Sequence, residues 1–195
     1  MATVLTTRRL RLREWRFPDA LPYDRYCNTE AVMEHLGGTV SFRSVRAEVA
    51  WFIAEAKRHG HTFWVLERKR DRMFLGFCGI IKVPDRQSPF RGELEIGWRI
   101  RDDQWRRGYA HEAARAVIAW TAKHRRGQQV IARIAPENRR SQHLARKVGM
   151  RERRAWRHAD AVDGSVHRVW RLANGDKLGA DTPPSAIEQG RGERR

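Results

Sequence analysis

The spacing of apolar residues predicts alternating strands and helices along most of this chain. Leu10 and Leu12 alternate with arginines, as the buried positions of a half-exposed first strand do. Residues 22–36 predict a helix that ends at the glycine pair 37–38, and residues 45–58 predict a second helix with apolar side chains three and four positions apart. Two helices therefore follow the first strand.

The rest of the chain continues with strands and two more helices. Strand-like runs lie at 62–67, 74–83, 93–100 and 129–135, and two final strands flank an Asp163–Gly164 hairpin turn. A small-residue stripe from Ala110 predicts a helix that Gly127 ends, and Asn138 caps a shorter helix. Gly149 occupies the position of a left-handed C-cap.

This order of elements indicates an α/β protein with one domain. At 195 residues the chain is long enough for one well-packed core and short for two. Residues 1–173 carry the periodic pattern, whereas residues 174–195 are rich in glycine, proline and charge without an apolar period. We therefore predict a domain at 1–173 followed by a disordered tail at 174–195.

Cysteine usage and hydropathy point to a reducing, aqueous environment. Cys27 and Cys78 lie far apart and form no Cys-x-x-Cys pair, so we expect two free thiols, buried or half-buried. No apolar run approaches the roughly 20 residues that a membrane span needs, and the N-terminus lacks the apolar core of a signal peptide. These features predict a cytoplasmic protein without membrane contact.

The net charge of +17 is concentrated in the predicted domain. Residues 174–195 hold four basic and four acidic residues, so the tail is neutral. Residues 139–157 hold eight basic residues and one acid, Glu152. Such a segment attracts polyanions: nucleotide phosphates, acidic peptides or ribosomal RNA. Arginines far outnumber the six lysines. Because arginine codons are mostly GC-rich, part of the excess positive charge also fits a GC-rich genome.

The stretch from Trp105 to Ala113 combines a strand end, a glycine turn and a helix start. The N–H groups of a first helical turn have no partner within the helix, and the helix dipole adds partial positive charge there. Arg106 and Arg107 add full charges, and Gly108 lets the backbone approach a ligand closely. This combination predicts a phosphate or pyrophosphate site. An ordinary helix start with solvated arginines is the alternative.

Four segments, in order, resemble the GNAT superfamily of N-acetyltransferases, and in particular its RimJ/RimL-type branch. The phosphate-loop pattern of that branch, Trp-Gly-x-Gly-Tyr-Ala-x-Glu-Ala, is similar to residues 105–113, with Arg106 in place of the first glycine. Residues 7–13, 95–98 and 138–150 resemble its N-terminal Thr-Glu-Arg-Leu-x-Leu-Arg, its fourth strand and its Asn-x-x-Ser…Lys-x-Gly-Phe block. The resemblance covers residues 7 to about 172.

The resemblance implies the GNAT fold, a mixed central β-sheet with helices on both faces that is splayed between the fourth and fifth strands. It also implies acetyl-CoA as co-substrate and no metal. The pantetheine arm would bind backbone groups of Trp98, Arg99 and Ile100, and Asn138 would contact the cofactor. The pyrophosphate would rest on the amides of Arg106, Arg107, Gly108, Tyr109 and Ala110.

Acetyl transfer from a thioester to an amine requires a neutral amine, a stabilised oxyanion and protonation of the leaving thiolate. Glu95 on the predicted fourth strand is the candidate base, acting through a water, and Glu93 on the same face is the second candidate. Pairing of Glu95 with one of the many arginines is the alternative. Ser141 is the candidate donor to the thiolate, or else a surface serine without a role. Tyr109 is expected to pack against the sheet.

The acceptor is the least constrained part of the prediction. The branch implies the N-terminal α-amine of a protein or peptide, attacked directly in a ternary complex, and the basic segment 139–157 would recruit an acidic chain or the ribosome. A small-molecule amine is one alternative, although polycationic amines favour an acidic cleft. A basic RNA- or ribosome-binding protein is the alternative from another class. The oligomeric state stays open between monomer and homodimer.

Motifs for other chemistry are missing from the sequence. His111–Glu112 begins like a zinc-protease motif, but position 115 is arginine, so the second metal ligand is missing. The chain contains no Gly-x-Gly-x-x-Gly, no Walker-type loop and no Gly-x-Ser-x-Gly elbow. We therefore predict a metal-free enzyme that uses neither a dinucleotide nor a serine nucleophile.

Overall fold

A single mixed sheet of eight strands organises the computed structural model, which describes residues 3–83, 90–157 and 166–172. Neighbouring strands are antiparallel except for one parallel pair, β5 with β6. In spatial order the strands are β1 (Thr3–Thr6), β2 (Leu10–Arg13), β3 (Phe63–Arg68), β4 (Phe74–Lys82), β5 (Leu94–Ile100), β6 (Val130–Ile134), β8 (Val166–Leu172) and β7 (Met150–Arg157).

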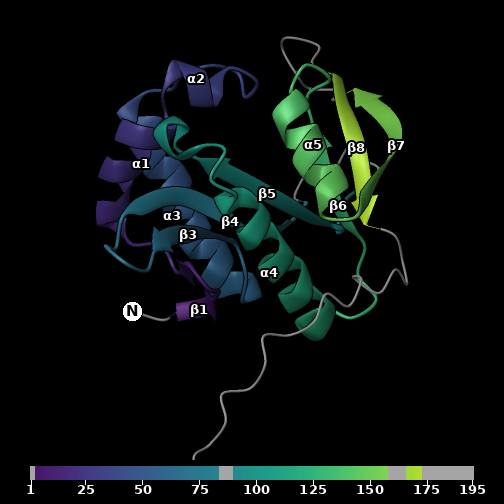
Figure 1. Cartoon of the computed structure of the whole chain (residues 1–195), viewed down its shortest axis with the longest axis horizontal. Coiled ribbons are helices and arrows are strands. Elements are labelled where there is room, and N and C mark those ends of the chain that lie inside the picture. Colours follow the sequence, from purple (N-terminus) through teal and green to yellow (C-terminus); the bar gives the residue numbers. More distant parts are fainter. Residues whose placement is uncertain (1–2, 84–89, 158–165, 173–195) are drawn as a thin grey trace, which may run out of the picture.

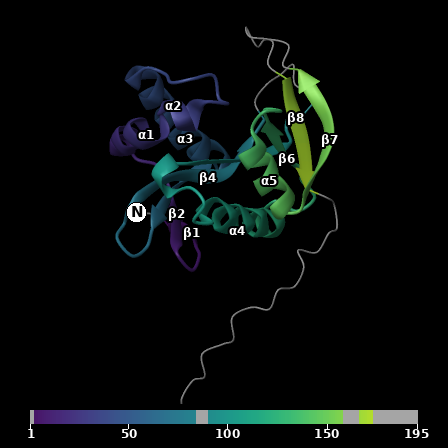
Figure 2. The same ribbon diagram turned by 45° about the horizontal axis from the view of Figure 1, so that its top comes forward.

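Helices cover both faces of this sheet, as predicted (Figure 1). On one face, α4 (Tyr109–His124) and α5 (Arg139–Lys147) enclose the larger core with the inward side chains of β2 to β6. On the other face, α1 (Ala20–Cys27) and α3 (Phe42–His59) enclose an aromatic core. Figure 2 shows α3 and α4 on opposite sides of β4. The short elements are η1 (Phe17–Asp19), α2 (Glu30–Met33) and η2 (Asp102–Gln104).

The single helix predicted at 22–36 is wrong, because the chain breaks it at Asn28 and Thr29. Asn28 leaves the helical region, and its side-chain amide bonds the backbone N–H and C=O of Val40 instead. Thr29 is extended, and its hydroxyl accepts from Val32 N to cap α2. These local side-chain bonds compete with helical ones, which the apolar spacing alone does not reveal.

The strand β1 was also missed. It has four residues at the edge of the sheet and no buried position, so it has no apolar period to detect. The other strands and helices agree with prediction, including the long helix at 45–58, the Asn138 cap and the left-handed Gly149. Cys27 and Cys78 are free and buried, as expected.

The Asp163–Gly164 turn and the tail at 174–195 lie outside the described residues. The two strands that flank this turn, β7 and β8, do pair antiparallel. Among the described helices, none is both long and apolar enough to cross a membrane.

Candidate active site

A cavity of about 620 Å³ lies between α2 and α5, at the end of β5 and in front of the N-terminus of α4 (Figure 1). Four segments form its walls: residues 31–36, the end of β5, residues 104–111 and residues 138–147. Of the residues predicted to bind acetyl-CoA or to act on it, those that line the cavity are Trp98, Arg99, Ile100, Arg106, Gly108, Tyr109, Ala110, Asn138 and Ser141.

The cavity exists because β5 and β6 diverge. They pair only at Leu94 with Val130 and at Glu95 with Ile131, while β5 continues to Ile100. The N–H of Leu94 bonds Gln129 on the β6 side, and the period of a strand then turns the backbone of Trp98 to that same side. The free N–H and C=O of Trp98 at this open edge suit a pantetheine amide.

The backbone of Arg99 faces the opposite way. The N–H of Arg101 donates to Leu75 O on β4, so alternate residues of β5, including Arg99, direct their backbone groups to β4. Arg99 therefore contributes its side chain to the cavity and leaves the backbone contact to Trp98.

Two left-handed residues shape the phosphate loop between η2 and α4. Arg106 has φ 59° and Gly108 has φ 76°. The first backbone bond of α4 runs from Glu112 N to Gly108 O, so the N–H groups of Tyr109, Ala110 and His111 have no partner within the helix. Three such N–H groups lie at the positive end of a 16-residue helix on the cavity wall, an arrangement that suits an anion.

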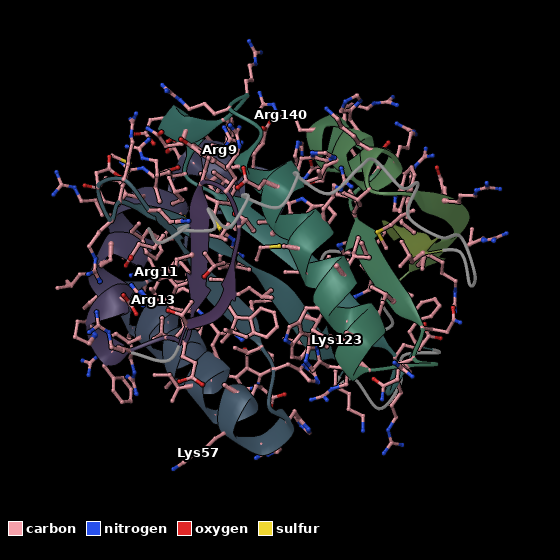
Figure 3. The ribbon with its side chains drawn as sticks, turned by 60° about the horizontal axis from the view of Figure 1, so that its bottom comes forward. Arg9, Arg11, Arg13, Lys57, Lys123 and Arg140 are labelled. Atoms are coloured by element: carbon pink, nitrogen blue, oxygen red, sulfur yellow. The ribbon has the colours of Figure 1, made fainter. Side chains whose placement is uncertain are left out.

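Arg9 supports this loop from the opposite side. Its Nη1 donates to Arg107 O at 2.9 Å, its Nε donates to Glu112 at 2.6 Å, and its guanidinium lies 4.6 Å from the ring centre of Tyr109. Figure 3 shows Arg9 beside the N-terminal end of α4, with Lys123 at the other end. Arg107 points its carbonyl to Arg9 and is not among the described residues that line the cavity.

Ser141 connects α5 to β5 across the splay. Its backbone N–H donates to Asn138 Oδ1 at 3.0 Å, and its hydroxyl accepts from Trp98 Nε1 at 3.2 Å. Because the indole fills an acceptor position of the hydroxyl, the Ser141 O–H can donate into the cavity. This orientation fits a donor to a leaving thiolate.

The predicted carboxylates are engaged with arginines. Glu95 receives two hydrogen bonds from Arg133, at 3.0 and 2.7 Å, and Glu93 receives one from Arg171 at 2.8 Å. Neither carboxylate is among the described residues that line the cavity. The structure therefore brings Ser141 and the cofactor residues together but leaves Glu95 in the arginine pairing that the sequence allowed as an alternative.

The charge of the cavity wall is strongly positive. Its one described carboxylate is Glu34, whose Oε2 lies 3.6 Å from His35 Nε2. Burial, with help from Lys147 and Arg115, lowers the pKa of His111 and favours the neutral ring. The cationic side chains on the wall are Arg99, Arg106, Arg139, Arg140 and Lys147. Such a wall suits the phosphates of coenzyme A.

The wall at 31–36 was not predicted from the sequence. It carries the apolar Ala31, Val32 and Leu36 together with Glu34 and His35. No sequence motif marks these residues. They lie opposite the phosphate loop because the helix breaks after α1.

The chain matches the family model described as "Acetyltransferase (GNAT) domain" over residues 9–151. It belongs to the GNAT family of acetyltransferases. It is also 34% identical over 137 residues to the uncharacterized protein YkkB of Bacillus subtilis (strain 168), which covers 70% of this chain and 78% of YkkB. The chain is therefore an acetyl-CoA-dependent acetyltransferase with the GNAT fold.

Solved structures of several acetyltransferases share this fold. A putative GNAT-family acetyltransferase from Bordetella pertussis has a TM-score of 0.74 at 22% identity, covering 88% of this chain and 100% of that one. A ribosomal-protein-S5-alanine acetyltransferase from Vibrio fischeri has a TM-score of 0.70 at 14% identity, with 90% and 98% covered. An aminoglycoside acetyltransferase, AAC(6')-Ib, in complex with coenzyme A has a TM-score of 0.66 at 14% identity, with 84% and 94% covered.

The last two neighbours are named for different acceptors, so the fold alone does not identify the amine that this chain acetylates. Within the described residues, no group of three or more histidine, cysteine or acidic side chains is placed to hold a metal ion.

Proposed function

We propose that this enzyme transfers the acetyl group of acetyl-CoA to the N-terminal α-amine of a protein or peptide, within the RimJ/RimL-type branch of the family. The observation that supports the proposal most is the cavity, which runs from the phosphate loop to a separate wall at 31–36 where the second substrate would bind. An α-amine has a pKa of about 7.7–8.0, so a useful fraction is neutral near pH 7 without a strong base.

An α-amine needs little help from a base, which fits a cavity that neither Glu93 nor Glu95 lines. Ser141 is proposed to donate to the thiolate, because its hydroxyl lines the cavity and is oriented by Trp98. Glu95 is proposed as a base only through rearrangement of its pairing with Arg133 or through a water. Backbone N–H groups of β5 are the proposed oxyanion donors.

A small-molecule amine is the second candidate, and the aminoglycoside acetyltransferase among the structural neighbours keeps it open. A polycation, however, would meet five cationic side chains and one carboxylate on the cavity wall. That charge disfavours polyamines and aminoglycosides as acceptors, and it favours neutral or acidic ones. Association with the ribosome through the basic segment 139–157, and a cytoplasmic location, belong to the same proposal.

The cofactor site is tested with two variants of Gly108. Aspartate and asparagine are the side-chain-bearing residues that best tolerate a left-handed backbone, and an added Cβ would meet only Arg9 Nη2, at 3.4 Å. Gly108→Asp places a negative charge at the phosphate position and should abolish coenzyme A binding in calorimetry. Gly108→Asn has the same size without the charge and should bind more tightly than the Asp variant. Equal affinity of a folded Gly108→Asp variant and the native enzyme would refute the site.

The acceptor is tested by incubating the enzyme with acetyl-CoA and a panel of amines. Peptides that differ in their first residue, a polyamine and an aminoglycoside would be compared by mass spectrometry. We expect acetylated peptides with the label on the α-amine. Turnover of the small amines without any peptide product would contradict the proposal.

A further inference from the structure

Arg99 and Trp98 line the same cavity from opposite faces of β5. Trp98 packs against the core under α4, whereas Arg99 lies over the rings of Tyr23 and Phe77 on the side of α1 and α3. Successive residues of a strand point to opposite faces, so a cavity that touches both must pass around the free edge of β5. The cofactor residues occupy one side of that edge, and Arg99 occupies the other.

The guanidinium of Arg99 is nearly buried but poorly paired. Its side chain is 14% exposed, and Nη1 donates to the hydroxyl of Tyr23. Nε is buried without a hydrogen-bond partner. The polar contacts of Arg99 with described residues are made through Nη1, and none of them involves Nη2. Glu48 lies 3.9 Å from Nη1, beyond hydrogen-bond distance, and already accepts from Tyr23 at 2.7 Å. The Nε–Nη2 edge of Arg99 therefore lacks an acceptor.

The hydrogen-bond partners of other arginines with little exposure differ from those of Arg99. Arg13 binds Asp19 through Nη1 and Nη2, both at 2.8 Å, and Glu67 through Nε at 3.2 Å. Three others have a carboxylate of the same chain on the Nε–Nη2 edge, with two hydrogen bonds of 3.0 Å or less. The pairs are Arg68 with Asp71, Arg101 with Asp103 and Arg133 with Glu95. A purely structural Arg99 would be expected to have such a partner, because an unpaired buried charge is costly.

We infer that the missing partner is a carboxylate of the acceptor, so that Arg99 selects amines that carry a carboxylate close to the reactive nitrogen. The inference rests on the proposed transfer to an α-amine and narrows its substrate class. Tyr23 holds the guanidinium in place, because its hydroxyl accepts from Arg99 and donates to Glu48. A planar guanidinium edge binds a carboxylate through two parallel hydrogen bonds.

The phosphates of the cofactor are not the expected partner of Arg99. Their site is formed by the N-terminus of α4 together with Arg106, Arg139 and Arg140, on the other side of the β5 edge. Arg140, which stacks 4.4 Å from the ring of Trp105, marks that side in Figure 3. The carboxylate can come from an acidic side chain near a peptide N-terminus or from the α-carboxylate of a free amino acid.

The native enzyme is tested first, with matched acceptors. Peptide pairs differ only by Glu or Gln at the first or second position, and a second arm compares free alanine with alaninamide. In at least one pair, the acceptor with the carboxylate should have a kcat/KM about tenfold to a hundredfold higher than its amide counterpart, as expected for a charge-assisted bidentate bond. If the enzyme prefers Glu over Gln in the peptide pairs, the acceptor is a chain with an acidic N-terminal segment. If it prefers alanine over alaninamide, the acceptor is a free amino acid.

Arg99→Gln should then remove the preference. Its effect should appear as a larger rise in the KM of the carboxylate acceptor than in the KM of the matched neutral acceptor. Arg126→Gln is the matched control, because Arg126 is exposed after α4 and away from the cavity. If Arg99→Gln does not fold, Tyr23→Phe replaces it: loss of the hydroxyl that holds Arg99 should lower the preference while the aromatic packing stays.

Two results would overturn the inference. One is an equal kcat/KM within every acid–amide pair for the native enzyme. The other is a preference that survives in folded Arg99→Gln. In both cases amines are still acetylated, so the proposed function stands. Failure to acetylate any peptide while small amines react would instead contradict the proposed function itself.

Discussion

Glu112 connects the N-terminal segment to the phosphate loop, and Glu112→Ala should both destabilise the enzyme and weaken its cofactor site. Oε1 accepts from the hydroxyl of Thr7 at 2.5 Å and from the backbone N–H of Arg9 at 2.8 Å, and Oε2 accepts from Arg9 Nε at 2.6 Å. The substitution removes both acceptor oxygens, and with them all three hydrogen bonds, and leaves Arg9 free to move away from Arg107 O, which it holds at 2.9 Å.

The magnitude follows from the number of bonds and their exposure. A hydrogen bond to a charged group contributes about 1.5–3 kcal/mol when buried. The side chains of Arg9 and Glu112 are 34% and 17% exposed, so solvent screens the ion pair and reduces its contribution. We expect a loss of roughly 2–3 kcal/mol in the free energy of unfolding. For a chain of this size the melting temperature should fall by about 4–10 °C.

Urea unfolding and thermal melting, each with and without coenzyme A, measure these effects. Glu14→Ala is the control, because Glu14 is exposed and lies outside the phosphate loop. Glu112→Gln keeps the shape of the side chain and should lose less than Glu112→Ala. A Glu112→Ala enzyme that melts within 1–2 °C of the native one, about the size expected for an ordinary surface change, would refute this account of the loop.

The lowered pKa of Glu112 predicts that the free energy of unfolding depends on pH. Burial raises the pKa of Glu112, but the hydrogen bonds from Thr7 and Arg9 outweigh burial and lower it overall. A folded pKa below the unfolded value stabilises the fold at pH values above the unfolded pKa, which is about 4.3 for glutamate. That stability is lost as the pH falls through the lower, folded pKa. The difference between native enzyme and Glu112→Ala should therefore shrink in acid below about pH 4.

Two further predictions concern the loop backbone and the catalytic groups. Arg106→Gly should raise the free energy of unfolding by about 1 kcal/mol in urea titrations, because Arg106 is left-handed at φ 59° and glycine adopts that region without a Cβ penalty; a clear loss of stability would contradict this. Ser141→Ala and Glu95→Gln should each lower kcat, with coenzyme A affinity nearly unchanged in calorimetry, by about 10²-fold or more if each transfers a proton. Full activity of Glu95→Gln from pH 6 to 9 would leave Glu93 or solvent as the base.

The sequence by itself determined most of the order of elements and predicted the phosphate loop. Both depend on short-range rules: apolar period, capping by Asn138 and the left-handed Gly149 are local properties of the backbone and its neighbours. The loop at 105–113 was also readable because its glycine turn, its arginines and the helix start lie in one short segment.

Only the tertiary structure decided which side chains meet. The pairing of Glu95 with Arg133 joins two strands that are far apart in sequence, and any of 40 basic residues could have been its partner. The wall at 31–36 depends on the break at Asn28, which is set by its bonds to Val40. The unfilled edge of Arg99 becomes visible only when the partners of every other buried arginine are known, because charge balance inside a fold is a property of the whole packing arrangement.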